Sequence, residues 1–111
     1  MTLDNERVAI TSATKALVVG LGRSGFAAVR LLHKLGAGVA ATDSAPRVKI
    51  SGEVLSWLEE NRISLQCGTL AGDLLEGINL IVVSPGVPLQ QQFFAAAREQ
   101  GIRVIGELAL A

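Results

Sequence analysis

Residues 20–25 read GLGRSG, which has the G-x-G-x-x-G spacing of a phosphate-binding turn. In such a turn the first glycine allows a sharp change of direction. The second lets a diphosphate approach the backbone, and the third lets the following helix pack closely. Free N–H groups at the helix start favour a phosphate, so we expect contacts from Gly22, Arg23, Ser24 and Gly25. The glycines could instead serve only to form a tight turn.

An acidic residue, Asp43, ends the second strand pattern, 18 residues after Gly25. In a doubly wound sheet this position lies beside the first turn, above the carboxyl ends of the strands. A carboxylate there accepts hydrogen bonds from hydroxyl or N–H groups of a nucleoside, so Asp43 is a candidate ligand residue. Two other roles stay open: a solvated acid in a loop, and a cap for the next helix.

The clearest strand pattern, NLIVVS at residues 79–84, is followed by Pro85 and Gly86. If the strand order is 3-2-1-4-5, the first and fourth strands are neighbours whose connections leave to opposite sides. Ligands bind in the crevice at the carboxyl ends of such strands. Gly22, Asp43 and Ser84 would then converge on one cleft, although they are far apart in the sequence. Pro85 and Gly86 could also do no more than form a turn.

Short apolar runs alternate with helical patterns along most of the chain. Strands are predicted at residues 15–20, 39–43, 63–67, 79–84 and 103–105, and helices from the glycine turn to residue 35, at 53–61 and at 89–100. The alternation predicts an α/β domain with a Rossmann-like doubly wound sheet of five parallel strands in the order 3-2-1-4-5. Residues 1–14 are expected to form a loose lead-in to the domain at 15–111, and residues 106–111 to begin a further element.

Several residues within these elements are assigned to packing. The buried stripe of the first helix is expected to consist of four residues at helical spacing: Ala28, Leu31, Leu32 and Leu35. Trp57 is expected in the helix–sheet core, and Phe93 and Phe94 are expected to pack as well. His33 lies off the apolar stripe and is expected to face solvent. Pro88 suits the first position of the third helix.

The composition restricts the classes of function. Lys plus Arg and Asp plus Glu number 10 each, so the formal net charge is zero, which argues against partners such as nucleic acid or a membrane surface. The single cysteine, Cys67, excludes an internal disulfide and a cysteine-based metal site. No catalytic set, metal site or Walker-type ATP loop is recognisable in the sequence. We expect no signal peptide, no membrane span and a cytoplasmic location.

Several motifs together resemble the N-terminal domain of the Mur ligases. They are the GLGRSG turn, Thr-Asp-Ser at 42–44, Gly-Thr-Leu at 68–70, Leu-Ile-Val-Val-Ser-Pro-Gly-Val at 80–87 and Ile-Gly-Glu-Leu at 105–108. The resemblance runs from residue 15 to the end of the chain and is closest to the branch that adds D-glutamate. The turn alone is shared with many dinucleotide-binding proteins. The turn, the aspartate and Ser-Pro-Gly at these separations are much more specific.

The resemblance implies a function in peptidoglycan synthesis, and hence in cell wall biogenesis, cell shape and division. Ligases of this branch join D-glutamate to UDP-N-acetylmuramoyl-L-alanine, using ATP and magnesium. They have three domains, of which the first holds the UDP part of the substrate, the second carries the ATP loop and the third helps to bind the amino acid. This chain would be the first domain only. We therefore expect no catalytic residue, cofactor or metal in it, and no turnover by it alone.

Carried over to this sequence, the resemblance implies which positions meet the nucleotide. Arg23 and Ser24 match positions that meet the diphosphate. Asp43 and Ser44 match positions that meet the uridine. The loop at residues 84–86 matches the one that closes over the nucleotide.

The sequence departs from the family pattern at a few positions. Ala45 stands where an arginine commonly follows the pair at 43–44, and Arg47 is a candidate substitute for it. Ala109 stands where members often have glutamate, and the lead-in before Lys15 is long. These departures bear on individual contacts with the nucleotide.

A glycine turn followed by an acid is also the fingerprint of dinucleotide binding. On this alternative the chain is an NAD-binding module of a dehydrogenase or of a regulatory protein. Asp43 would then hold the adenosine ribose and favour NAD over NADP. No residue suited to hydride transfer stands out. The two functions differ in the ligand they predict: UDP for the ligase domain and NAD for the module.

Overall fold

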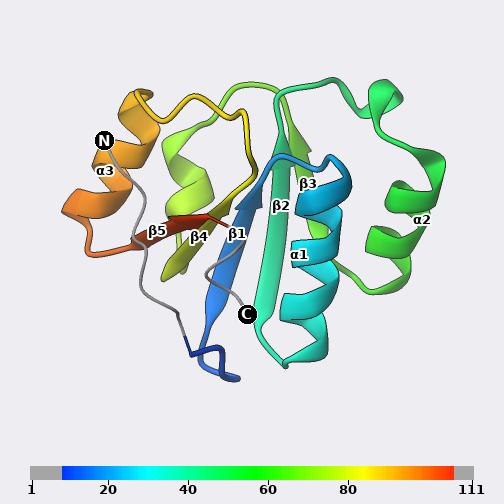
Figure 1. Cartoon of the computed structure of the whole chain (residues 1–111), viewed down its shortest axis with the longest axis horizontal. Coiled ribbons are helices and arrows are strands. Elements are labelled where there is room, and N and C mark those ends of the chain that lie inside the picture. Colours follow the sequence, from blue (N-terminus) through cyan, green and yellow to red (C-terminus); the bar gives the residue numbers. More distant parts are fainter. Residues whose placement is uncertain (1–8, 107–111) are drawn as a thin grey trace.

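Five parallel strands form one sheet: β1 (Lys15–Val19), β2 (Gly38–Asp43), β3 (Ser64–Cys67), β4 (Leu80–Val83) and β5 (Arg103–Gly106). Their order is β3-β2-β1-β4-β5, which confirms the predicted order (Figure 1). The helices are α1 (Arg23–Lys34), α2 (Gly52–Glu60) and α3 (Gln92–Glu99), with 3₁₀ helices η1 (Arg47–Lys49) and η2 (Gly72–Leu75). The computed structural model describes residues 9–106, so the first part of the expected lead-in and the element expected after Gly106 lie outside the described residues.

Strand β1 lies at the centre of the sheet, and its pairing defines the edge at which the site forms. Its last residue, Val19, pairs with Thr42 of β2 and with Val83 of β4. The residue after each of these three lies at the same edge: Gly20, Asp43 and Ser84. Because the strands are parallel, this edge carries all their carboxyl ends, as the sequence predicts.

Side chains of the central strands alternate between two apolar layers. Ala16 and Val18 of β1 pack in the layer of α1 and α2, whereas Leu17 and Val19 pack in the layer of α3 and η2. All residues of β4 are buried and alternate in the same way. Figure 1 shows α1 and α2 together on one side of the sheet and α3 on the other. Burial of both faces explains why these strands are continuous apolar runs.

The buried face of α1 differs from the predicted stripe. Ala28 and Leu32 are buried, but Leu31 is 36% exposed and Leu35 is 44% exposed, so the prediction is wrong for these two leucines. The buried residues of the helix are Gly25, Ala28, Val29 and Leu32. A Cβ on Gly25 would lie 1.7 Å from a backbone oxygen of the preceding turn. This close packing fixes the rotation of the helix. The helix therefore buries Val29 against the sheet and leaves Leu31 and Leu35 exposed.

Helix α3 begins at Gln92, so the prediction that Pro88 opens this helix is wrong. A turn at residues 89–90 separates the proline from the helix. Gln91 caps the helix with extended backbone angles, φ −64° and ψ 140°. Its Nε2 donates a hydrogen bond to the carbonyl oxygen of Pro88 at 3.1 Å, which stabilises this non-helical approach. Phe93 and Phe94 are buried, as predicted.

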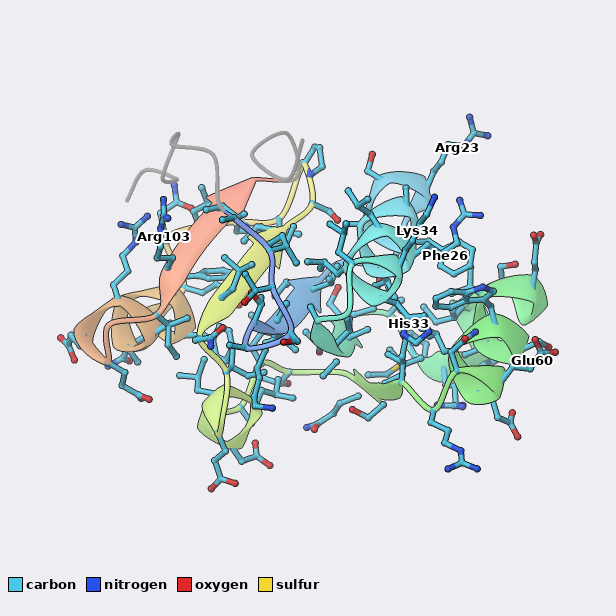
Figure 2. The ribbon with its side chains drawn as sticks, turned by 90° about the horizontal axis from the view of Figure 1, so that it is seen from below. Arg23, Phe26, His33, Lys34, Glu60 and Arg103 are labelled. Atoms are coloured by element: carbon cyan, nitrogen blue, oxygen red, sulfur yellow. The ribbon has the colours of Figure 1, made fainter. Side chains whose placement is uncertain are left out.

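Trp57 lies between α1 and α2 and packs, partly buried, against the core on that face of the sheet. It is half-buried, and its ring meets the rings of Phe26 and His33 edge-on, at centroid distances of 5.5 Å and 5.6 Å. Arg30 lies over the Phe26 ring, 4.7 Å from its centroid. Figure 2 shows Phe26 and His33 on the side of α1 that faces α2. His33 is exposed, as predicted, and these aromatic contacts join the two helices at the border of the core.

All three α-helices end in the same hydrogen-bonded cap, but the cap of α2 contains no glycine. The N–H groups of Arg62 and Ile63 donate back to carbonyls in the last turn of α2. This is the Schellman motif, whose left-handed residue is usually glycine. Gly36 after α1 and Gly101 after α3 have φ of +90° and +80°, whereas Arg62 adopts φ 56° with a side chain. The end of α2 is therefore strained relative to the other two.

Replacing Arg62 with glycine should raise the free energy of unfolding by about 0.5–1 kcal/mol. The left-handed conformation is costly for a residue with a Cβ, and the entropy of an unfolded glycine offsets part of the gain. Urea denaturation followed by circular dichroism measures the difference. Gly101→Ala is the matched control at the same position after α3, and should lower the free energy. An Arg62→Gly chain no more stable than the original would contradict the prediction.

Candidate functional site

The glycine-rich turn joins β1 to α1, as predicted. Gly20 has φ +96°, which glycine adopts without a steric cost, and its N–H donates to the carbonyl oxygen of Thr42 at 2.8 Å. Gly25 packs so closely on the carbonyl oxygen of Gly20 that no side chain fits between them. Gly22 is exposed, and a Cβ built on it would meet nothing within 4 Å. The turn, the open backbone and the close packing correspond to the three glycine roles predicted from the motif.

The first turn of α1 leaves backbone N–H groups without helical partners. Gly22 is the N-cap, and the N–H of Phe26 donates to its carbonyl oxygen at 2.9 Å. The N–H groups of Arg23, Ser24 and Gly25 therefore have no acceptor within the helix. The cap residue makes no side-chain hydrogen bond, and the first turn contains no acidic residue. This positive end of the helix dipole suits an anion.

Asp43 lies beside the glycine turn, as predicted. Its Oδ2 accepts a hydrogen bond from the N–H of Leu21 at 2.6 Å, and its Oδ1 accepts one from the N–H of Ala45 at 2.9 Å. The side chain is half-buried, and the N-cap of α2 is Ser51. Asp43 is therefore neither a fully solvated acid nor the cap of that helix. Carboxylate oxygens have several lone pairs, so the group can still accept a hydrogen bond from a ligand.

Ser84 contacts the same turn from the other side. Its hydroxyl donates a hydrogen bond to the carbonyl oxygen of Gly20 at 2.9 Å. Pro85 and Gly86 then form a turn, with Gly86 at φ +89° and the N–H of Val87 donating to the carbonyl oxygen of Ser84 at 3.4 Å. The turn-forming role that the sequence left open for residues 85–86 is present, and both residues also line a cavity.

This cavity, of about 550 Å³, lies at the carboxyl ends of the strands. Of the predicted site residues, Asp43, Ser44 and the loop at 84–86 line it, whereas residues 22–25 do not. The remaining lining residues are Val19, Gly20, Gly68, Thr69, Leu70, Val87, Pro88 and Gln91. Gly20 belongs to both the cavity wall and the glycine turn. The structure therefore divides the predicted site into a cavity and an adjoining helix terminus.

The chemistry of the cavity differs from that of the helix terminus. Among residues 9–106, Asp43 is the only ionisable side chain in its lining. The other polar side chains of the lining are Ser44, Thr69, Ser84 and Gln91. A neutral group with N–H or O–H donors suits this cavity better than an anion, which the carboxylate would repel. One ligand could therefore place its neutral part in the cavity and its anionic part on the start of α1.

The sequence patterns do not single out residues 68–70 or Gln91 as site residues. Residues 68–70 directly follow β3, so the parallel topology was a signal that could have placed them at this edge. Gln91 enters the lining because α3 begins late, and no sequence pattern marks it.

Two arginines considered for ligand contacts lie away from the cavity. Arg23 is exposed, and Figure 2 shows its side chain projecting away from the body of the molecule. Arg47 is exposed in η1 and is not part of the cavity lining. Ala45, which departs from the arginine of the family pattern, supplies its N–H to Asp43. The position of Ala109 lies outside the described residues.

Residues 9–106 contain neither a cluster of metal ligands nor a membrane-spanning helix. In this part of the chain no three His, Cys, Asp or Glu residues are grouped so that they could hold a metal ion. None of its helices is both long enough and apolar enough to cross a membrane. Cys67, at the end of β3, is a free and partly buried thiol.

Three comparisons relate these features to known proteins. A family model described as the Mur ligase MurD-like, N-terminal domain matches residues 14–106. UDP-N-acetylmuramoylalanine–D-glutamate ligase from Pelotomaculum thermopropionicum is 44% identical over 97 residues, which are 87% of this chain and 21% of that protein. The chain therefore spans about a fifth of the length of the curated relatives it matches.

Solved structures with low sequence identity share the fold. The UDP-N-acetylmuramate:L-alanyl-gamma-D-glutamyl-meso-diaminopimelate ligase from Neisseria meningitides matches with a TM-score of 0.66 at 15% identity, over 85% of this chain and 29% of that one. Shikimate dehydrogenase from Aquifex aeolicus matches with a TM-score of 0.54 at 16% identity, over 86% of this chain and 43% of that one. At these identities the likeness concerns the Rossmann-like fold alone.

Proposed function

Because this chain belongs to the MurD-like N-terminal domains of the Mur ligase family, we propose that it holds the UDP part of UDP-N-acetylmuramoyl-L-alanine for a ligase that adds D-glutamate. One observation carries the proposal beyond the family match. A cavity lined by Asp43 and by neutral side chains of the described part of the chain adjoins the open N-terminus of α1. A nucleoside diphosphate has the same two parts, a neutral hydrogen-bonding base and sugar joined to an anion.

The diphosphate would bind at residues 22–25, where three N–H groups lack helical acceptors and Gly22 is open. The uridine would occupy the cavity. Uracil offers an N–H and ribose offers hydroxyls, and Asp43 and Ser44 would bind these groups. The loop of residues 84–86 would close over the nucleotide. Arg23, though it points outward, lies at the first turn and would add a positive charge near the diphosphate.

The complete reaction would need parts that this chain does not include. The relatives are about five times as long as the matched segment, which leaves room for a central ATP-binding domain and a C-terminal domain. We assign ATP and magnesium to those domains and expect no turnover by the 111-residue chain alone. We also assign the reaction to the cytoplasm, as a step in building peptidoglycan.

Binding of NAD is the alternative that the glycine turn leaves open. The likeness to shikimate dehydrogenase concerns the fold alone, whereas the family match and the 44% identical ligase favour UDP.

Titration of the 111-residue chain with UDP, and separately with NAD, tests the proposal by backbone amide NMR. We expect UDP to shift the amides of residues 22–25, 43–44, 84 and 86, and NAD to leave them unshifted. The same shifts with NAD alone would contradict the proposal and would indicate a dinucleotide-binding module instead. Silence toward both ligands would contradict UDP binding by this chain alone.

A further inference from the structure

The peptide group between Gly20 and Leu21 is held at both of its polar ends. Its carbonyl oxygen accepts the hydroxyl proton of Ser84 at 2.9 Å, and its N–H donates to the carboxylate of Asp43 at 2.6 Å. Asp43 ends β2 and Ser84 follows β4, the two strands that pair with β1. Side chains from both neighbouring strands thus clamp one peptide plane at the foot of the glycine turn.

This peptide plane needs such restraint, because Gly20 has no Cβ to limit its rotation and already adopts φ +96°. A reversal of the plane would exchange a partial positive N–H and a partial negative carbonyl at the foot of the anion-binding turn. Fixing the plane before a ligand arrives removes the cost of ordering it on binding.

We propose that Ser84 and Asp43 are positioning residues, which hold the Gly20–Leu21 peptide so that the N–H groups at the start of α1 face the diphosphate. This inference rests on the proposed binding of UDP. It gives Ser84 a role other than direct contact with phosphate. A hydroxyl has one proton, and Ser84 donates it to Gly20, which leaves none for a phosphate oxygen. Asp43 can both hold Leu21 and accept a hydrogen bond from the nucleoside.

Amide hydrogen exchange in the free chain tests the clamp without a ligand. Ser84→Ala leaves the acceptor of the Leu21 N–H in place, yet we expect this amide to exchange about tenfold faster than in the original chain, relative to the core amide of Val18. Ser56→Ala, at an exposed serine of α2, is the matched control and should leave the rate unchanged. An unchanged Leu21 rate in Ser84→Ala would overturn the proposal.

Pyrophosphate and uridine, used separately, distinguish positioning from direct contact. Ser84→Ala should weaken pyrophosphate binding about tenfold and uridine binding by a smaller factor. Asp43→Ala should weaken pyrophosphate binding as well, and Asp73→Ala, at an exposed acid of η2, should not. The double variant should bind pyrophosphate no more weakly than the weaker single variant, because both act through one peptide. A double variant whose loss of pyrophosphate affinity equals the product of the two single losses would overturn the proposal. If the original chain binds neither probe nor UDP, the proposed function fails, and the Leu21 exchange rate still decides the clamp.

Discussion

Alanine at position 25 should abolish UDP binding and lower the free energy of unfolding by about 3 kcal/mol or more. The added Cβ would lie 1.7 Å from the carbonyl oxygen of Gly20 and 2.8 Å from Oγ of Ser84. The first of these is a backbone atom, so relief requires a shift of α1 or of the turn itself. Such a shift also breaks the alignment of the N–H groups proposed to bind the diphosphate. Urea denaturation and UDP titration by NMR measure the two effects.

Gly22→Ala is the matched control in the same turn. Its Cβ would meet no atom within 4 Å, so the loss of stability should stay near the cost of an alanine N-cap, about 1 kcal/mol. The methyl group would nevertheless stand where the diphosphate approaches, and UDP binding should weaken about tenfold. An unchanged free energy of unfolding in Gly25→Ala would contradict the close packing of α1 on the turn. An unchanged affinity for UDP in Gly22→Ala would contradict the proposed path of the ligand.

The order of the strands could be predicted because it depends on local patterns and a general rule of handedness. The run at residues 80–83 is apolar without interruption, and all four residues are buried on both faces of the sheet. Parallel strands joined by helices then leave few arrangements, of which 3-2-1-4-5 is the one found. The meeting of the glycine turn with Asp43 and Ser84 follows from that order, since each comes at the carboxyl end of a central strand. The residue of the turn that lines the cavity is Gly20, however, and not the predicted Gly22.

The orientation of the helices could not be read in the same way. Periodicity showed that one side of α1 is apolar, but both Leu31 and Val29 fit a helical stripe. The contact of Gly25 with the preceding turn decides between them, and this contact joins atoms that no spacing rule relates. The late start of α3 likewise depends on how Gln91 folds back on Pro88.

The location of the site could be predicted from the sequence, whereas its individual hydrogen bonds could not. Sequence spacing put Asp43 beside the turn, but its bond to Leu21 depends on the exact direction of a side chain. The same is true of Ser84, expected to close over the nucleotide and found to donate to Gly20. Thr69 and Gln91 line the cavity because distant loops meet there, and that meeting is a property of the folded sheet.

Phe94→Ala should lower the free energy of unfolding by about 3–5 kcal/mol, which is a large part of the about 5–15 kcal/mol expected for a domain of this size. Phe94 has no exposed surface and packs in the layer of Leu17, Ile81 and Val104, with the ring of Phe93 edge-on at 5.4 Å. Truncation leaves a cavity that these strand residues cannot fill. Urea denaturation followed by circular dichroism gives the loss.

The same substitution should also reach the ligand site. Alanine keeps the backbone N–H that position 94 donates to the carbonyl oxygen of Gln91, a residue of the cavity wall, so a shift of α3 into the space left by the ring would move Gln91 with it. At temperatures where the variant is still folded, UDP should bind more weakly than to the original chain. Phe26→Ala is the control, since this ring is partly exposed between α1 and α2, and its removal should cost about 1 kcal/mol. Equal losses of stability in the two variants would mean that α3 does not cover its face of the sheet. A larger loss of stability in Phe94→Ala with unchanged UDP affinity would mean that packing under α3 does not affect the binding cavity.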